Sequence, residues 1–384
     1  MAVLLSTIFA LVSVLGSCRS SNYEYQVPQA TGDGWSTASL ADVGLDPEPF
    51  VDLVEFVEDD EARAMHGIIV IKADKLVFEQ YFDGYRFDYD DPQFRGERVS
   101  YDFQTRHNPM SITKAVTGAL VGQAIDDGLI AGVDEPVLEY SPQYAHLTDE
   151  AKDQITVEDL LTMTSGLEWN EGDVPLTDVD NNDLIQLFVV DDPIEYILAK
   201  PAVHEPGTYW YYSGGDVNLL GEFFEQATGV SIDEYSQTHL FEPLGITDYQ
   251  WRYINPEIVY TSGELELRPR DLAKFGSLYL NGGVWNGTQV ISNAWVDASI
   301  REHVSIPGRA ADGDGYGYHW FTRTYESNGA PVTAALRTGW GGQAVIVFPD
   351  HDTLVVLTGG DYLLQRQLAD LITDYLVPAI AATT

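Results

Sequence analysis

The sequence contains a single cysteine in 384 residues. One cysteine cannot form a disulfide within the chain, so no such bond stabilises the fold. Basic residues are also scarce, because 20 Lys and Arg face 60 Asp and Glu and give a formal net charge of −40. Such a charge repels nucleic acids and anionic lipid surfaces. We therefore exclude nucleic acid as a partner and interpret the acidity as a solvated surface.

Motifs that signal several other chemistries are missing. The sequence has no Gly-x-Ser-x-Gly elbow, no His-Glu-x-x-His zinc motif and no Gly-Lys pair of a phosphate loop. The acidic run 178–183 lacks the glycine and the distal glutamate of a calcium loop. Gly339 and Gly341 superficially match a dinucleotide fingerprint, but a strand pattern follows them instead of a helix. We expect neither a metal nor a cofactor.

Long apolar runs are lacking apart from residues 2–17, which end in small residues directly before Cys18. This stretch is too short for a comfortable membrane span and has the shape of a signal peptide, which we place at residues 1–18. Leu15-Gly16-Ser17-Cys18 resembles a bacterial lipobox, which implies a lipidated Cys18; a cleaved signal with an incidental cysteine is the alternative. Residues 19–35 read as a tether. We expect an exported, periplasmic or cell-envelope protein whose only membrane contact is a lipid anchor.

Strand patterns occur near both ends of the remaining chain. Residues 66–82 form two β-branched apolar runs around Ala73-Asp74-Lys75, a hairpin pattern, and residues 46–59 before them have helical spacing. Three further strand patterns lie in the last third of the chain, at 316–324, 343–348 and 353–358, before a helical tail from about Leu363.

The middle of the chain is dominated by helical patterns and polar loops, from about residue 109 to 245. We therefore predict an α/β (α+β) fold, in which one antiparallel sheet is built from both chain ends and is flanked by helices, with a helical insert. A single domain would span 36–384, with its sheet part at about 46–105 and 255–384 and its helical part at about 106–254.

Residues 106–129 hold the most informative pattern. Asn108 is a good N-cap, Pro109 suits the first helical position and Gly128 suits the stop. The helix should begin just before Ser111. The hydroxyl and amide of Ser111 then lie in the first turn, where unpaired amides and the helix dipole favour negative charge.

Ser111 and Lys114 are three residues apart, so on a helix they share one face with Cβ atoms about 5–6 Å apart. A lysine spans that distance. The rest of the helix is small and apolar, which predicts that it is buried. Burial disfavours the charged form of a lysine, which suits Lys114 to act as a base toward Ser111.

Ser-x-x-Lys alone is a weak pattern, but residues 106–129 resemble the nucleophile helix of the penicillin-recognising serine hydrolases. Five further segments, in the expected order, resemble the class C β-lactamase-related branch, which includes esterases, D-alanyl carboxypeptidases and nylon-oligomer hydrolases. They are ITVEDLLTMTSGL (155–167), EPGTYWYYSGGDVNLLGEFFEQATG (205–229), FEPLGIT (241–247), RPRDLAKFGSLYLNGG (268–283) and GWGGQ (339–343). The resemblance covers about residues 47–375.

The resemblance implies that Tyr212 is the catalytic tyrosine, whose phenol passes protons between the nucleophile, Lys114 and the leaving group. Tyr209, Trp210 and Tyr211 lie in the same loop and compete for this place, but the register with the following helix favours Tyr212. Lactam-active relatives often have an asparagine where this chain has Gly214. The missing amide argues against β-lactam turnover.

The third family element maps to Arg337-Thr338-Gly339. By the resemblance these residues bind substrate, and the amides of Ser111 and Trp340 form an oxyanion hole in which each donor contributes about 2.7–4 kcal/mol. Arg337 replaces the usual lysine and is expected to hold a substrate carboxylate bidentately. A surface ion pair in this acidic protein is the alternative.

These residues together predict a serine hydrolase with a Ser111 acyl-enzyme, most simply an esterase or amidase acting on a small ester, amide or peptide. D-Alanyl carboxypeptidase and β-lactamase activities are alternatives within the family. A non-catalytic, membrane-tethered protein that binds peptidoglycan is the alternative of another class. The oligomeric state stays open.

Overall fold

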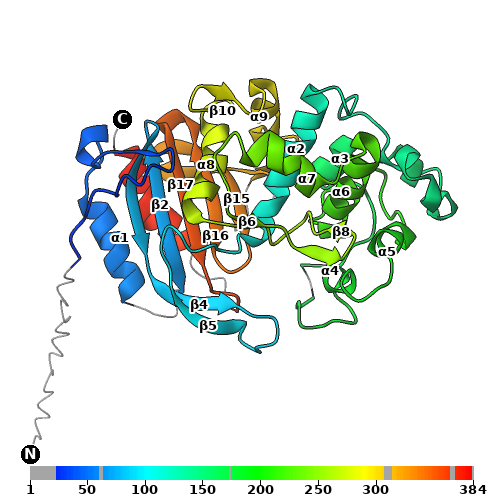
Figure 1. The fold of residues 1–384 in the computed structure, drawn as a ribbon, viewed down its shortest axis with the longest axis horizontal. Coiled ribbons are helices and arrows are strands. Elements are labelled where there is room, and N and C mark those ends of the chain that lie inside the picture. Colours follow the sequence, from blue (N-terminus) through cyan, green and yellow to red (C-terminus); the bar gives the residue numbers. More distant parts are fainter. Residues whose placement is uncertain (1–22, 60–63, 173, 307–313, 364–367, 383–384) are drawn as a thin grey trace, which may run out of the picture.

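The computed structural model describes residues 23–59, 64–172, 174–306, 314–363 and 368–382. The predicted signal peptide, Cys18 and the first residues of the tether lie outside these ranges. The described chain forms a large mixed sheet with helices on both faces (Figure 1). This confirms the predicted fold class.

The main sheet has nine strands among the described residues, in the order β1-β3-β2-β17-β16-β15-β14-β13-β12. Their bounds are β1 Ser36–Thr37, β2 Met65–Lys72, β3 Lys75–Tyr81, β12 Val304–Ser305, β13 Gly315–Tyr316, β14 Phe321–Ser327, β15 Ala330–Gly339, β16 Gln343–Phe348 and β17 Thr353–Gly359. All neighbours pair antiparallel except the short edge strand β1, which runs parallel to β3. β2 pairs with β17, so strands from both parts of the chain form one sheet, as predicted.

The hairpin between β2 and β3 turns at Ala73 and Asp74, which both have positive φ, at 51° and 59°. Two consecutive left-handed residues are the geometry of a type I′ turn. The single strand predicted at 316–324 is wrong, because the chain turns between β13 and β14, where the Gly317 amide donates to the carbonyl of Trp320. The stretch therefore forms two paired strands.

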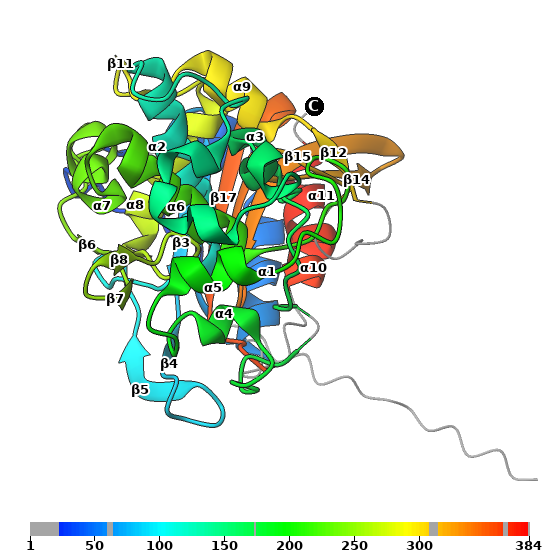
Figure 2. The same cartoon turned by 90° about the vertical axis from the view of Figure 1, so that its right-hand side faces the viewer.

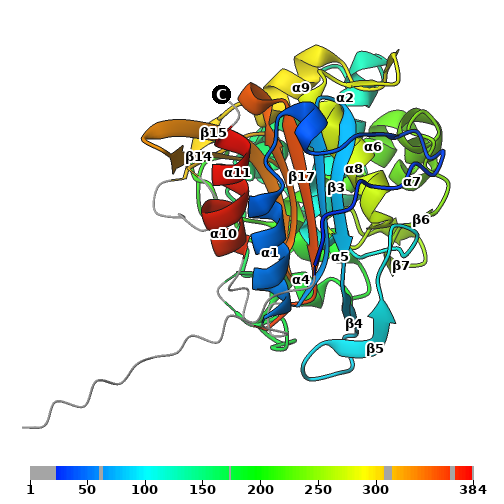
Figure 3. The same ribbon diagram turned by 90° about the vertical axis from the view of Figure 1, so that its left-hand side faces the viewer.

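Both faces of the sheet are buried. Ile68 and Val70 of β2 belong to one core cluster and Ile69 and Ile71 to another, as the alternation of side chains along a strand requires. The first cluster lies under α1 (Glu48–Glu58), α10 (Leu368–Asp370) and α11 (Val377–Ala381), which Figure 3 shows side by side on one face. The second lies under α2 (Thr113–Asp126), α8 (Pro269–Leu280) and α9 (Asn293–Ile300).

Of the predicted helical part, α2 packs on the sheet, and the helices that follow it lie to one side of the sheet (Figure 1), the side that faces the viewer in Figure 2. Its helices are α3 Val157–Thr162, α4 Asp183–Gln186, α5 Pro193–Ala199, α6 Gly214–Thr228 and α7 Ile232–Ser236. Short strand pairs complete the fold: β4 (Asp83–Phe87) with β5 (Arg95–Ser100), β6 (Tyr249–Gln250) with β9 (Glu266–Leu267), β7 (Tyr253–Asn255) with β8 (Ile258–Val259), and β10 (Val284–Trp285) with β11 (Thr288–Gln289). None of the described helices has the length and apolarity to cross a bilayer.

The start of α2 differs from the expectation. Residues Met110–Ile112 form a 3-10 turn and the α-helix begins only at Thr113, so Ser111 precedes the α-helix. The Asn108 side chain accepts from the amide of Met110, which has a left-handed φ of 52°. Gly128 ends the helix with a φ of 72°, as predicted. The tight turn directs the Ser111 hydroxyl away from the core while α2 itself stays buried.

Candidate active site

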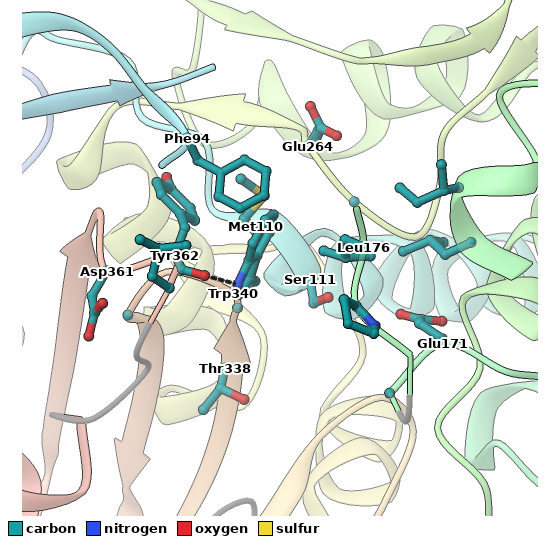
Figure 4. A pocket seen from close by; sticks show the side chains of 18 of the residues that line it. Phe94, Met110, Ser111, Glu171, Leu176, Glu264, Thr338, Trp340, Asp361 and Tyr362 are labelled. Carbon is teal, nitrogen blue, oxygen red and sulfur yellow. Dashed lines mark hydrogen bonds between the residues drawn. The ribbon is translucent and has the colours of Figure 1, made fainter. Parts of the chain in front are cut away.

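A cavity of about 870 Å³ lies where the turn before α2 meets the end of β15. Ser111 lines it together with Tyr212, Thr338, Gly339 and Trp340. Figure 4 shows the Ser111 hydroxyl in this space, with Trp340 and Thr338 on the β15 side and Glu171 on the opposite side. Residues from four distant parts of the sequence therefore share one cavity.

Lys114 reaches the nucleophile as its spacing predicts. Its Nζ lies 3.1 Å from Ser111 Oγ and donates to the carbonyl of Ser262 at 2.6 Å. The side chain is fully buried. The ammonium also lies 5.0 Å from the centre of the Tyr212 ring. The amine of Lys114 thus contacts the Ser111 hydroxyl and lies beside the ring of Tyr212.

Tyr212 is the aromatic residue of its loop that lines the cavity. Tyr209 is half exposed and stacks on His204, and Trp210 packs on Tyr316. The phenol of Tyr212 accepts a hydrogen bond of 2.8 Å from Nη2 of Arg337. Because a guanidinium can only donate, the phenol keeps its own proton for another acceptor.

Arg337 is not a surface residue, so the predicted surface ion pair is wrong. Its side chain is fully buried, with Nε donating to the carbonyl of Ser111 at 2.8 Å and Nη1 donating to the Tyr316 phenol at 3.0 Å. It is also absent from the residues that line the cavity. The predicted bidentate contact between Arg337 and a substrate carboxylate is therefore wrong. The guanidinium lies behind the nucleophile and already donates hydrogen bonds to protein oxygens.

Thr338, Gly339 and Trp340 line the cavity at the end of β15. A Cβ on Gly339 would lie 2.3 Å from the carbonyl of Pro109, so only glycine allows the strand to approach the nucleophile turn this closely. The Trp340 indole donates to the carbonyl of Tyr362 at 2.9 Å, which fixes the ring at the cavity wall. The oxyanion hole of the Ser111 and Trp340 amides stays a prediction.

Asp216 connects the segment of Tyr212 (205–229) to Ser165, in the Ser-Gly-Leu sequence that ends the segment 155–167, through hydrogen bonds. Its carboxylate accepts from the hydroxyls of Ser165, at 2.8 Å, and Ser213, at 3.0 Å. It is buried, and burial raises the pKa of Asp216 to about 7. Sequence reasoning missed this residue, although its place three residues after Ser213, a capping spacing, is a local signal for it.

Two glutamates at the cavity were also missed. Oε2 of Glu171 accepts from the amide of Gly214 at 2.6 Å and from the Trp169 indole at 2.9 Å. Glu264 accepts from the phenol of Tyr89 at 2.5 Å and from the Asn108 amide at 3.3 Å, and burial raises the pKa of Glu264. No sequence motif distinguishes these two carboxylates from the other acidic residues.

The described residues contain no group of His, Cys, Asp and Glu side chains arranged to hold a metal ion. His107 is buried and its Nε2 lies 2.8 Å from Nδ1 of His66. It does not line the cavity of Ser111. This agrees with a structural role for His107.

Comparisons with known proteins find hydrolases among the proteins similar to this chain. The 6-aminohexanoate-dimer hydrolase of Paenarthrobacter ureafaciens is 28% identical to this chain over 211 residues, which cover 53% of each chain. The lovastatin esterase of Penicillium rubens is 28% identical over 190 residues, which cover 45% of this chain and 46% of the esterase. The chain thus aligns with about half the length of these curated relatives. A putative 6-aminohexanoate-dimer hydrolase from Bacillus anthracis superposes with a TM-score of 0.67 at 19% identity, covering 85% of this chain and 80% of that one.

A family model described as Beta-lactamase matches residues 55–372, which is most of the chain. The match includes the Ser111 turn, the Tyr212 loop and the end of β15. The chain therefore belongs to the beta-lactamase family of hydrolases.

Proposed function

We propose that this protein hydrolyses an ester or amide through a covalent acyl-enzyme on Ser111. The observation that carries the proposal is the 3.1 Å contact between Lys114 Nζ and Ser111 Oγ in a cavity that Tyr212 also lines. A nucleophile, a base and a third group that orients them are what acyl transfer requires.

This arrangement supports the following reaction. Ser111 Oγ attacks the substrate carbonyl and its proton passes to the Lys114–Tyr212 pair, which then protonates the leaving alcohol or amine. The resulting ester on Ser111 is cleaved when water attacks the same carbonyl, with the same pair taking the proton of the water and returning it to Ser111 Oγ. The amides of Ser111 and Trp340 are the proposed donors to the oxyanion of both tetrahedral intermediates.

An ester or amide substrate is favoured over a β-lactam by the third position of the tyrosine loop. A Cβ on Gly214 would lie 2.7 Å from the Leu184 side chain and 2.9 Å from Oε2 of Glu171. Neighbouring residues thus occupy the place of the asparagine that holds a carbonyl in lactam-active relatives. A carboxylate accepts hydrogen bonds and cannot donate one to a carbonyl oxygen.

Turnover of p-nitrophenyl butyrate by wild type, Ser111→Ala and Tyr212→Phe tests the proposal. We expect the rate to fall at least 10³-fold in Ser111→Ala, because the nucleophile is gone. A fluorophosphonate should add to Ser111 in the wild type, seen as a mass shift of the peptide that contains it. Absence of both turnover and adduct would leave a non-catalytic binding protein as the better reading.

A further inference from the structure

The charged side chains that line the cavity of Ser111 are all acidic. Among the described residues that line the cavity, the carboxylates of Glu171, Glu264 and Asp361 are present and no Lys, Arg or His is found. Figure 4 shows Glu171 to one side of Ser111, and Glu264 and Asp361 farther out at the top and far left of the view. The nearby cations Lys114 and Arg337 are fully buried, and each already donates to protein oxygens. A substrate entering the cavity therefore meets negative charge.

Glu171 is the carboxylate best placed to contact a substrate. Both of its hydrogen bonds, from Gly214 and Trp169, go to Oε2, and no described residue donates to Oε1. These bonds fix the carboxylate against the start of α6, beside the loop of Tyr212. A fixed carboxylate with one oxygen unoccupied is a site for a donor or a cation.

Glu264 and the aromatic lining strengthen this preference. Both carboxylate oxygens of Glu264 already accept hydrogen bonds from protein groups, so Glu264 acts on a substrate through its electrostatic potential and not through a direct hydrogen bond. Phe188, Tyr260 and Trp340 supply aromatic surface in the same cavity. Aromatic faces attract alkylammonium groups and accommodate their methyl groups.

Resting on the proposed function, we propose that Glu171 selects cationic substrates: esters or amides that carry an ammonium group a few bonds from the scissile carbonyl. Substrates with a carboxylate at that place are rejected, because Glu171 and Glu264 repel it and Arg337 is not available to pair with it. This selection excludes penicillins and the carboxylate end of D-alanyl peptides, which both present an anion beside the reactive carbonyl.

Matched esters test the proposal. We would compare kcat/KM for three p-nitrophenyl esters that share one leaving group: 5-(trimethylammonio)pentanoate, its neutral isostere 6,6-dimethylheptanoate, and monoadipate. A second pair, butyrylcholine and its neutral isostere 3,3-dimethylbutyl butyrate, tests a positive charge on the alcohol side of the ester. We expect at least one cationic ester to exceed its neutral isostere about tenfold and the adipate ester to be the poorest of its series. The preference should shrink between 20 mM and 500 mM NaCl, since salt screens charges.

Glu171→Gln and Glu168→Gln form a matched pair. Both substitutions remove one negative charge from the same loop. Glu168 is the control because its side chain is exposed and does not line the cavity. The Glu171→Gln side chain still has an oxygen that can accept from Gly214 and Trp169. The ratio of cationic to neutral kcat/KM should fall about tenfold in Glu171→Gln and change less than twofold in Glu168→Gln. Equal ratios in the two variants, or an adipate ester cleaved as fast as the cationic one, would overturn the selection.

A binding measurement separates this proposal from the proposed function. Calorimetry on Ser111→Ala would compare the unreactive amides 5-(trimethylammonio)pentanamide, 6,6-dimethylheptanamide and adipamate. Tighter binding of the cationic amide, lost in Ser111→Ala/Glu171→Gln, supports the selection even if no ester is cleaved. Equal binding of the three overturns it even if Ser111 proves to be the nucleophile.

Discussion

The side chain of Arg337 is hydrogen-bonded to both Ser111 and Tyr212. Its Nε donates to the carbonyl of Ser111 and its Nη2 donates to the phenol of Tyr212, both at 2.8 Å. A guanidinium makes these two bonds from a planar, rigid group, so the distance between the two partners is held constant. The ammonium of a lysine is a single point of donation and cannot reproduce that spacing.

We expect Arg337→Met to lower kcat/KM for p-nitrophenyl butyrate by at least tenfold and to destabilise the fold. The Ser111 carbonyl and the Tyr316 phenol lose a donor inside the protein, which costs roughly 1–3 kcal/mol for each group left unpaired. Arg337→Lys should recover part of the activity. Fluorophosphonate labelling rates and urea unfolding measure the two effects.

Arg323→Met on the neighbouring strand β14 is the control, because it makes the same chemical change away from the cavity. If Arg337→Met labels Ser111 at the wild-type rate, the guanidinium does not position the two groups.

At the scale of elements, α2 sets the position of Ser111 and Lys114 through its burial. Two glycines give this helix its close contacts. A Cβ on Gly122 would lie 2.2 Å from the ring of Trp295 in α9, whereas on Gly118 the nearest atom is a carbon of His319 at 3.3 Å. Only the first contact demands that a buried ring be displaced.

We therefore expect Gly122→Ala to destabilise the protein by about 1–3 kcal/mol, the usual cost of overpacking a core. Gly118→Ala is the matched control in the same helix. Its effect should be near zero or stabilising, since alanine is favoured over glycine in a helix interior by about 1 kcal/mol. Urea unfolding compares the two, and equal losses would show that α9 adapts to the added methyl group.

A histidine pair joins β2 to the segment before the nucleophile turn. His66 of β2 and His107 are buried with 2.8 Å between Nδ1 and Nε2. Burial lowers the pKa of His107 to about 4 and lowers that of His66 as well. Because the unfolded chain then binds protons that the folded chain does not, stability from these groups is lost as the pH falls from about 6.5 toward 4.

We expect the wild type to lose about 2 kcal/mol more than His107→Gln between pH 7 and pH 5. Urea unfolding at a series of pH values measures the difference. His146→Gln is the control, since His146 is exposed at the surface. A His107→Gln profile parallel to that of the wild type would mean that this imidazole is protonated in the folded protein.

For the whole molecule, the charge of −40 dominates the response to salt. Self-repulsion of a compact, highly charged chain opposes folding, and added salt screens it. The Debye length falls from roughly 20 Å at 20 mM NaCl to about 4 Å at 0.5 M.

We therefore expect the Tm measured by calorimetry to rise by several degrees over this range. Tetramethylammonium chloride is the control, because it screens charge without binding as a small metal ion does. A rise with sodium alone would point to bound cations, and a falling Tm would mean that favourable ion pairs outweigh repulsion.

Local patterns in the sequence determined the elements and part of the site. Strand patterns at both ends predicted one sheet built from both parts of the chain, and three-residue spacing predicted the contact of Lys114 with Ser111. The strand patterns and this contact depend on residues close together in the chain, so local sequence encodes them, whereas the pairing of β2 with β17 was decided by the tertiary structure.

Only the tertiary structure decided which charged side chains meet. It buried Arg337 behind the nucleophile instead of exposing it, and it placed Glu171 against Gly214. Each outcome depends on contacts between segments that are far apart in the sequence. The partner of a charge is set by the packing of those segments, and the residues beside it in the chain carry no signal of that packing.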